Sequence, residues 1–365
     1  MVQLSKLALL GLATLSIAHP GGHESSEMSR NAKREFLNNA KRSLEKCSEH
    51  LERRGINARR EARRAAVYEA YRRSSLEARG YNSAVNTSHH SSLHVTEDTP
   101  ASELFSNDPV CILQPEATIG PFWVKGELVR SDLRDGEQGV PTILDAQFIN
   151  VETCEPVEGL FWDVWHANAT GVYSGVQDST NGNGDDTSNL NKTFLRGIQQ
   201  TDEDGVAQFK SIFPGHYQGR ATHIHVVAHV DSQVLPNNTL SGGHVAHIGQ
   251  LFFDQDLISE VEATYPYTEN TATITKNADD DILQTETEDT ASDPFLEYAL
   301  LGDSINDGIF AWVTLGVNVS ASYDTSYAAS LTSSGGVTNS DGMNGSGPGG
   351  APGDAPGNSS APMSK

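Results

Sequence analysis

The segment with the most potential for chemistry runs from Phe213 to His225 and reads FPGHYQGRATHIH. His223 and His225 are separated by one residue, so on a β-strand their side chains project from the same face and can share one metal ion. A His-x-His pair alone is more typical of a solvated strand face than of a metal site. Tyr217 precedes the pair, after a Pro-Gly turn, and adds a phenol oxygen to the two imidazoles.

A second tyrosine, Tyr173, ends the stretch WHANATGVY that begins at Trp165. A phenol ionises only near pH ~10 in water, but a highly charged metal ion lowers that pKa, and phenolate is a hard oxygen donor. Two phenolates and two imidazoles favour Fe(III) over Zn(II) or Cu(II), because hard anionic oxygens match a small, highly charged ion. The donor types therefore predict a ferric site.

Four segments in this order resemble the intradiol ring-cleavage dioxygenases, and specifically their secreted fungal branch. They are Gly120-Pro121-Phe122, the stretch from Arg130 to Gly136, the stretch from Trp165 to Tyr173, and the stretch from Pro214 to His225. The likeness spans roughly residues 111–255. Any one segment alone would be weak, whereas four in order are specific.

The resemblance implies that four side chains, together with a solvent hydroxide, ligate Fe(III): Tyr173, Tyr217, His223 and His225. It further implies that Tyr217 is the ligand displaced by substrate, and that Arg220 faces the bound aromatic ring. Gln250 matches a glutamine placed near the same ring, although an insertion, residues 231–243, separates it from His225 by more than in bacterial relatives.

The activity implied by this resemblance is cleavage of a small aromatic diol by O₂ between its hydroxylated carbons, giving a muconate-type diacid. A catechol must lose two protons to chelate a metal, and the Tyr217 phenolate and the hydroxide are bases at the site. The guanidinium of Arg220 would stabilise negative charge that develops on the ring and the oxygen.

Two other classes of function also fit parts of the sequence. One is a secreted, non-catalytic β-sandwich binding module. The other is a cupin-like Fe(II) or Zn(II) enzyme that uses His-x-His plus a carboxylate, for which Asp231 would be the acid. His229 shares the strand face of the pair, so a three-histidine site is a further option. We expect His166 and His216 to lie beside the site without touching metal, and His244 and His247 to lie in loops or on the surface.

The elements that must position these residues read as mainly β. Between residues 105 and 330, short apolar runs are separated by Gly, Pro, Asn and Asp, which predicts an antiparallel β-sandwich core. The expected strands are 142–151, 159–165, 205–212, 223–230, 249–253 and 308–317. Trp162, Trp165 and Phe253 are expected in the core, and the polar segments 181–186 and 279–289 in surface loops.

The flanking segments have different compositions. Residues 1–18 read as a signal peptide, so we expect a secreted, extracellular protein. Residues 19–80 read as a basic helical segment interrupted at Gly55, with 15 of the 25 lysines and arginines between residues 24 and 80. This segment is interpreted as a solvated helical hairpin or a pro-region cut at a dibasic site, or else as a docking or dimerising element or a polyanion-binding arm. Residues 81–104 read as a linker, and the Gly/Ser/Pro-rich residues 331–365 as a disordered tail.

The net charge of −23 argues against nucleic acid and anionic membranes as partners. Seven Asn-x-Ser/Thr sequons fit a glycoprotein on the secretory route: Asn86, Asn168, Asn191, Asn237, Asn318, Asn344 and Asn358. The chain has three cysteines, and an oxidising compartment favours pairing two of them. We expect a disulfide between Cys111 and Cys154, with Cys47 free or removed by processing.

Overall fold

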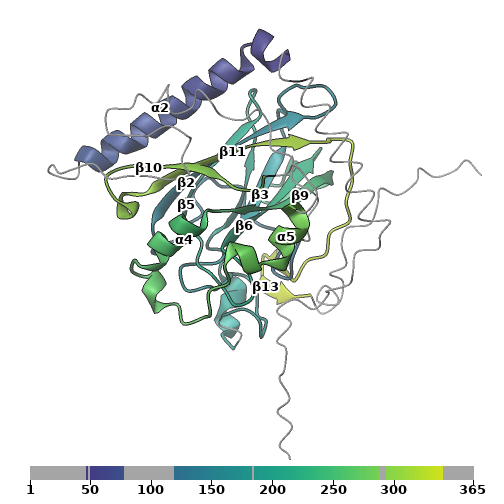
Figure 1. Ribbon diagram of the computed structural model, residues 1–365. Helices are drawn as coiled ribbons and strands as arrows, with labels where there is room; N and C mark the ends of the chain where they lie inside the picture. Colours follow the sequence, from purple (N-terminus) through teal and green to yellow (C-terminus); the bar gives the residue numbers. More distant parts are fainter. Residues whose placement is uncertain (1–46, 48–49, 78–118, 183–184, 288–292, 340–365) are drawn as a thin grey trace, which may run out of the picture.

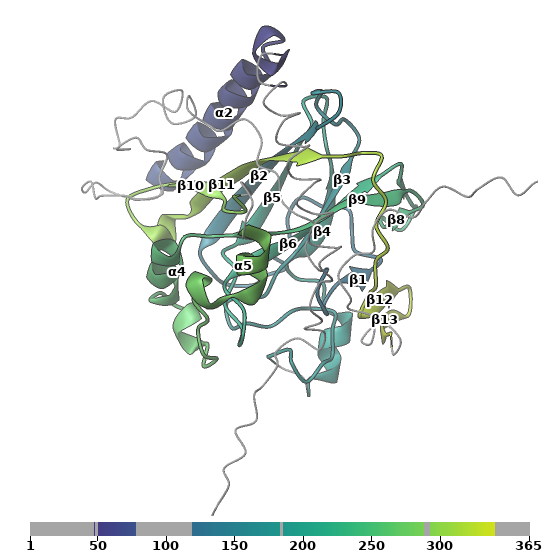
Figure 2. The ribbon, with the colours of Figure 1, turned by 45° about the vertical axis from the view of Figure 1, so that its right-hand side comes forward.

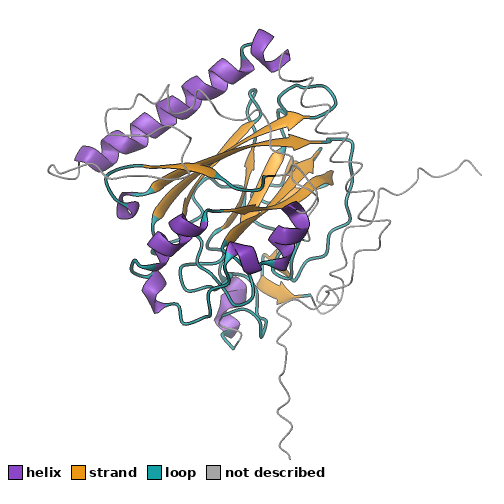
Figure 3. Cartoon of the chain, viewed as in Figure 1, coloured by secondary structure: helices purple, strands orange, loops and turns teal. Residues whose placement is uncertain are grey.

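The computed structural model describes residue 47 and residues 50–77, 119–182, 185–287 and 293–339. The expected signal peptide, the linker 81–104 and the tail beyond residue 339 lie outside these residues. The described chain is mainly β, with helices at its periphery (Figures 1 and 3). Across its described part, the chain contains no helix that is both long and apolar enough to cross a membrane.

Two four-stranded sheets pack face to face and form the sandwich within the described residues (Figure 3). The first sheet has the order β10 (Glu297–Leu300), β11 (Ile309–Val317), β2 (Pro141–Asn150), β5 (Val206–Ile212). The second has the order β4 (Arg196–Gln200), β3 (Phe161–Trp165), β6 (His223–Val230), β9 (His244–Phe252). Five of the expected strands closely match β2, β3, β5, β6 and β11, whereas β9 begins earlier than expected and β4 and β10 were not anticipated.

The pairing is antiparallel throughout the second sheet, as expected for a sandwich. In the first sheet, however, β11 pairs with β2 in parallel. The expectation of a wholly antiparallel core is therefore wrong for this pair. The two strands are far apart in the sequence, so no tight hairpin forces them to run in opposite directions, and a long crossover allows the parallel arrangement.

Alternation along the strands creates two different faces on the second sheet. Ile224 and Val226 of β6 point into the core between the sheets, where they meet Trp162 of β3 and Leu144 of β2. The alternate residues of the same strand, His223 and His225, point to the opposite face. The period of two thus places apolar side chains inside the sandwich and the histidine pair on the outer face of the second sheet.

The outer face of the first sheet is covered by helix α2 (Ile56–Glu77), which crosses it in Figures 1 and 2. Tyr68 of α2 packs edge-on against Phe310 of β11, with 6.3 Å between ring centroids. Arg64 is fully buried, and its Nε donates to the equally buried Asp145 of β2 over 2.9 Å. This part of the basic segment is therefore not a solvated helix, and its removal would expose Asp145 and a row of aromatic side chains. Whether it is processed as a pro-region stays a prediction.

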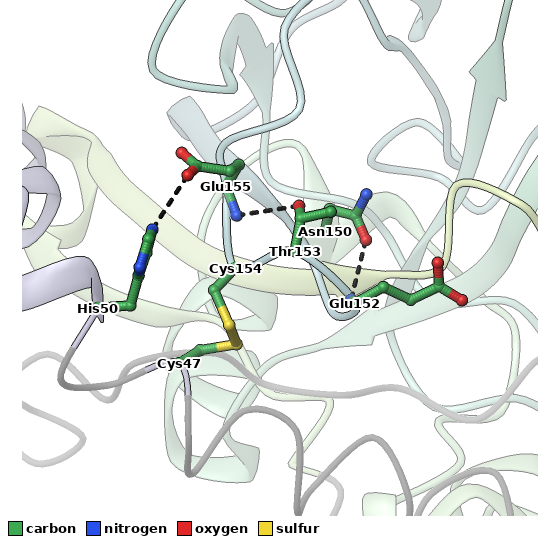
Figure 4. Close-up of a disulfide and its surroundings, with 7 residues drawn as sticks. All are labelled: Cys47, His50, Asn150, Glu152, Thr153, Cys154 and Glu155. Carbon is green, nitrogen blue, oxygen red and sulfur yellow. Dashed lines mark hydrogen bonds and ion pairs between the residues drawn. A yellow bond between two sulfur atoms is a disulfide. The ribbon is translucent and has the colours of Figure 1, made fainter.

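A disulfide joins Cys47 to Cys154 and ties the N-terminal segment to the turn after β2 (Figure 4). Beside it, Nε2 of His50 lies 3.0 Å from a carboxylate oxygen of Glu155. The expected pairing of Cys111 with Cys154 is wrong, and Cys111 lies outside the described residues. The expectation failed because it assigned Cys47 to a segment thought to be separate from the folded domain, whereas that segment packs against the sheet.

Smaller elements close the two ends of the sandwich. Strands β12 (Ala329–Thr332) and β13 (Gly335–Thr338) form a hairpin that adds to β1 (Val124–Lys125), so the domain extends beyond the expected boundary at residue 330. The insertion after β6 forms a hairpin of β7 (Gln233–Val234) and β8 (Leu240–Ser241). Helices α4 (Gln255–Glu262) and α5 (Asp281–Thr287) follow β9 in the chain.

Candidate metal centre and active site

The histidine pair sits at the start of β6, on the outer face of the second sheet. His223 and His225 are both buried, and their Nε2 atoms lie 3.0 Å apart. Nδ1 of His223 lies 2.7 Å from the carbonyl oxygen of Ala221, which can only accept a hydrogen bond. The proton of a neutral His223 therefore belongs on Nδ1, and Nε2 presents a lone pair toward His225.

Tyr217 reaches the same point from the turn that precedes β6. Its hydroxyl oxygen lies 3.4 Å from Nε2 of His223. The turn depends on Gly215, because a Cβ atom there would lie 2.3 Å from the carbonyl oxygen of Asn168. This close approach explains the Pro-Gly pair in the sequence, since only glycine lets the two backbone segments meet.

Tyr173 completes the group from the loop that follows β3. Its ring centroid lies 5.5 Å from that of Tyr217 and 5.9 Å from that of His225. Its side chain is buried, and its hydroxyl makes no hydrogen bond of normal geometry. A buried hydroxyl of this kind is costly unless another partner completes it, and a metal ion held by all four side chains would be such a partner.

The backbone of Tyr173 is fixed by two asparagines from the following loop. Asn181 accepts a hydrogen bond from the Tyr173 N–H and donates one to its carbonyl, both over 2.8 Å. Asn189 donates to the same carbonyl over 2.7 Å. The expectation that residues 181–186 form a surface loop is therefore wrong at Asn181, which is buried and positions a metal-ligand candidate.

A layer of packed rings holds the imidazole of His225 in place. Trp165 stacks on it with 4.8 Å between centroids and 3° between planes, which confirms that this tryptophan is a packing residue. Gly120 covers another side, where a Cβ would lie 2.9 Å from Cε1 of His225. Phe122 packs against Tyr173, with 4.8 Å between the ring centroids. The Gly-Pro-Phe segment thus forms one wall of the site.

Without a metal ion, the protein favours the protonated form of both tyrosine hydroxyls. Burial raises the pKa of Tyr173 well above 10, and the neighbouring Tyr217 hydroxyl adds to the rise. Burial also raises the pKa of Tyr217, while the positive charge of Arg220 opposes that change. A bound cation is therefore required to convert these phenols to phenolates near neutral pH.

Arg220 and Gln250 lie together beside the donors. Gln250 stands directly opposite His225 in the register of β6 and β9, so the two side chains share a face. Nη2 of Arg220 donates to Oε1 of Gln250 over 2.5 Å. The insertion after β6 forms its own hairpin and leaves this register intact, so Gln250 lies beside Arg220. Its place near a bound aromatic ring stays a prediction.

Asp280 holds Arg220 from the other side and was missed by the sequence analysis. Its Oδ2 accepts hydrogen bonds from Nε of Arg220 over 2.8 Å and from the backbone N–H of Ala221 over 2.7 Å. Asp280 is completely buried, although it belongs to an acidic segment expected on the surface. Its location, about sixty positions from Arg220 in the chain, gave no local signal.

A second buried charge group lies behind Tyr173. The Arg196 guanidinium lies 5.9 Å from the Tyr173 ring centroid and donates to Glu127 over 3.1 Å. Asp163 accepts from the indole N–H of Trp123 over 3.0 Å. Burial raises the pKa of Asp163 to about 6, and burial together with the charge of Asp163 raises that of Glu127.

The other histidines that the sequence analysis considered lie outside the donor group. His166 contacts Ser211 and His216 contacts Glu262, and burial lowers the pKa of His166 to about 4. His229 lies 3.1 Å from Asp163, which speaks against a three-histidine site. His244 is half-buried, and His247 is buried in β9, so the expectation of a loop or surface position is wrong for His247.

The arrangement of Tyr173, Tyr217, His223 and His225 can hold one metal ion. In the residues that the structure covers, no group of three or more histidine, cysteine, aspartate and glutamate side chains is arranged to bind a metal. The four donors do not form such a group, because two of them are tyrosines. Its four rings come from a loop, a turn and one strand, and their centroids lie within 4.6–5.9 Å for the neighbouring pairs.

Comparisons with known proteins agree with this geometry. Residues 121–293 match the sequence profile of a family described as Dioxygenase. The β-rich domain is therefore a dioxygenase. With the family's motifs in order and their donor side chains together, it belongs to the intradiol ring-cleavage dioxygenases.

Several solved structures are similar to this chain. An intradiol ring-cleavage dioxygenase from Tetranychus urticae shares 28% identity and has a TM-score of 0.48, with 57% of this chain and 96% of that chain covered. The dioxygenase domain of a carbohydrate-binding fusion protein from Streptomyces sp. SirexAA-E shares 23% identity, with a TM-score of 0.35 and coverage of 55% and 96%. Catechol 1,2-dioxygenase from Pseudomonas arvilla C-1 shares 19% identity, with a TM-score of 0.34 and coverage of 56% and 61%. A search of curated proteins found no match.

Proposed function

We propose that this protein is a secreted, Fe(III)-dependent dioxygenase that cleaves catechol-type rings between their two hydroxylated carbons and yields muconate-type diacids. The observation that carries the proposal is the convergence of two phenols and two imidazoles on one point. Hard phenolate oxygens favour Fe(III), and the buried, unbonded hydroxyl of Tyr173 fits a ligand awaiting its ion.

Tyr173, Tyr217, His223 and His225 would hold the ion. Fe(III), when bound, would supply the Lewis acidity and redox chemistry that allow a chelated diol to react with O₂. Tyr217 is the donor best placed to take a proton from an arriving diol, because the backbone of the other tyrosine, Tyr173, is held by Asn181 and Asn189.

The chain's other residues orient the ring and stabilise its charge. Arg220 is buried and fixed by Gln250 and Asp280, so its N–H donors are held in place to hydrogen-bond oxygen atoms of the bound ring, even though Asp280 offsets its net charge. Trp165 and Phe122 wall off the donors and exclude water. A dry site strengthens each electrostatic interaction within it.

Export is supported by two features. The sequence begins with a signal-peptide pattern. The Cys47–Cys154 disulfide joins two segments of the folded domain, and such bonds persist in oxidising compartments. We therefore expect the cell to export the protein with the Cys47–Cys154 disulfide formed. A protein that stays inside the cell with both of these thiols reduced would contradict export.

The proposal is tested with the purified, iron-loaded protein. We expect about one iron per chain, a visible phenolate-to-iron absorption band, and O₂ uptake on catechol, protocatechuate or hydroxyquinol. Tyr217→Phe and His225→Ala should lose uptake while they stay folded. Tyr298→Phe, which alters a buried tyrosine of β10 in the sandwich core, is the matched control and should keep it.

The outcomes separate the competing functions. A colourless protein with stoichiometric iron, or full uptake in His225→Ala, would contradict the proposed ligand set. A binding module would retain its binding in Tyr217→Phe. The cupin-like alternative is disfavoured because Asp231 is exposed beyond the far end of β6, about 20 Å from His225 along the strand.

A further inference from the structure

The charges beside the donor group are matched in pairs. Arg220 is buried with Asp280, and Arg196 is buried with Glu127. A third buried carboxyl, Asp163, lies next to the second pair. Within the described part of the chain, both arginines buried beside the donors therefore already have a carboxylate partner, which offsets the charge that an additional anion would need.

Among the residues that the structure describes, no other lysine or arginine is buried beside the donors. The other buried arginines of the described residues, Arg60 and Arg64, lie on α2 against the opposite sheet, and no described lysine is buried. Between Arg79 and Lys125 the sequence contains neither lysine nor arginine. Lys276 lies on the loop before Asp280, but it is exposed, so water screens its charge.

Asp280 is the residue that sets this balance next to the donors. Its two oxygens accept from Nε of Arg220 over 2.8 Å and from Nη2 over 3.4 Å. They also accept backbone N–H groups of Ala221 over 2.7 Å and Leu283 over 2.8 Å. Four hydrogen bonds fix the carboxylate, so it cannot move aside when an anion enters.

We propose that Asp280 is a specificity-determining residue that, by neutralising Arg220, restricts the enzyme to diols whose rings carry no carboxylate. This inference rests on the proposed function. The two oxygens of a diol can be balanced by the metal ion, whereas a ring carboxylate would have to be balanced by the chain. In a dry site an unbalanced charge is costly, so neutral diols are favoured by about tenfold or more.

The test compares two substrates of nearly equal size that differ in charge: 3,4-dihydroxybenzamide and 3,4-dihydroxybenzoate. The iron-loaded wild type should show a kcat/KM at least about tenfold higher for the amide. Asp280→Asn should shift the ratio toward the benzoate by a similar factor, because the charge of Arg220 becomes available. Lys276→Ala, which removes a nearby exposed charge, is the control and should leave the ratio unchanged.

Three results would overturn the inference: equal use of both substrates by the wild type, an unchanged ratio in Asp280→Asn, or an equal shift in Lys276→Ala. If Asp280→Asn does not fold, competitive inhibition of the wild type decides. There 4-hydroxybenzamide should bind at least about tenfold more tightly than 4-hydroxybenzoate, and equal binding would refute the inference. Failure to cleave any diol would instead refute the proposed function.

Discussion

Replacement of Arg64 by alanine should destabilise the whole domain, because Arg64 joins α2 to the first sheet through a buried ion pair. Neither Arg64 nor Asp145 has any exposed side-chain surface. Arg64 also donates to the carbonyl of Val313 over 2.9 Å. Removal of one partner from a buried pair costs about 3–5 kcal/mol. The lower part of that range is expected, since Arg63 and Gln208 still donate to Asp145 over 2.8 Å and 2.6 Å.

The assay is urea or thermal unfolding of the oxidised protein. For a domain of this size, about 3 kcal/mol corresponds to a fall in Tm of roughly 6–12 °C. Arg59→Ala is the matched control, because Arg59 pairs with Asp204 on the surface with half of its side chain exposed. Its effect should stay below about 1 kcal/mol. A loss below about 1 kcal/mol in Arg64→Ala would refute the conclusion that α2 is an integral part of the domain.

The same pair predicts a pH dependence. Burial alone would raise the pKa of Asp145, but Arg63 and Arg64 hold it below its ordinary value of 3.8. A carboxyl with a lowered folded-state pKa stabilises the protein above its unfolded pKa and loses that contribution as the pH falls through its folded pKa. The difference in stability between wild type and Arg64→Ala should therefore be full near neutral pH and shrink below pH ~4.

Three further changes test other parts of the structure. Asn181→Ala removes hydrogen bonds to the backbone of Tyr173, so iron retention against a chelator should fall about 10- to 100-fold, and unchanged retention would contradict a positioning role. Cys47→Ser removes a disulfide that spans 107 residues and should lower the free energy of unfolding by about 2–5 kcal/mol. Reduction should destabilise the wild type by a similar amount and should leave the variant unchanged. Asp163 has a folded-state pKa raised to about 6, so its contribution to stability is lost as pH rises from about 4 to 6. Asp163→Asn should therefore gain stability relative to wild type between these values, and a parallel pH profile of urea unfolding would refute the assignment.

The sequence predicted most of the strands, and the family resemblance named the four candidate donor side chains that the structure places together. That these four side chains bind a metal stays a prediction. Strands 142–151 and 223–230 were predictable because alternation of side chains is a local property that needs no knowledge of neighbours. The histidines 223 and 225 share a face for the same reason. The two tyrosines were recognisable because they lie at fixed offsets within local motifs, and the structure brings them to the same point.

Features that depend on contacts between distant segments were not predictable. The pairing of Cys47 with Cys154, the burial of Asp280 against Arg220, and the contact of Asn181 with Tyr173 each join segments whose compositions suggest exposed helix or loop. Composition reports how a segment interacts with water on average. It does not report which of its polar groups finds a buried partner.

For this protein the sequence therefore determined the chemistry that the site can perform, since donor type and local spacing are written in adjacent residues. Only the tertiary structure decided which charges compensate one another around that site and how the N-terminal helix is attached. Those properties arise from the burial of groups far apart in the chain, where the cost of an unpaired charge selects one arrangement.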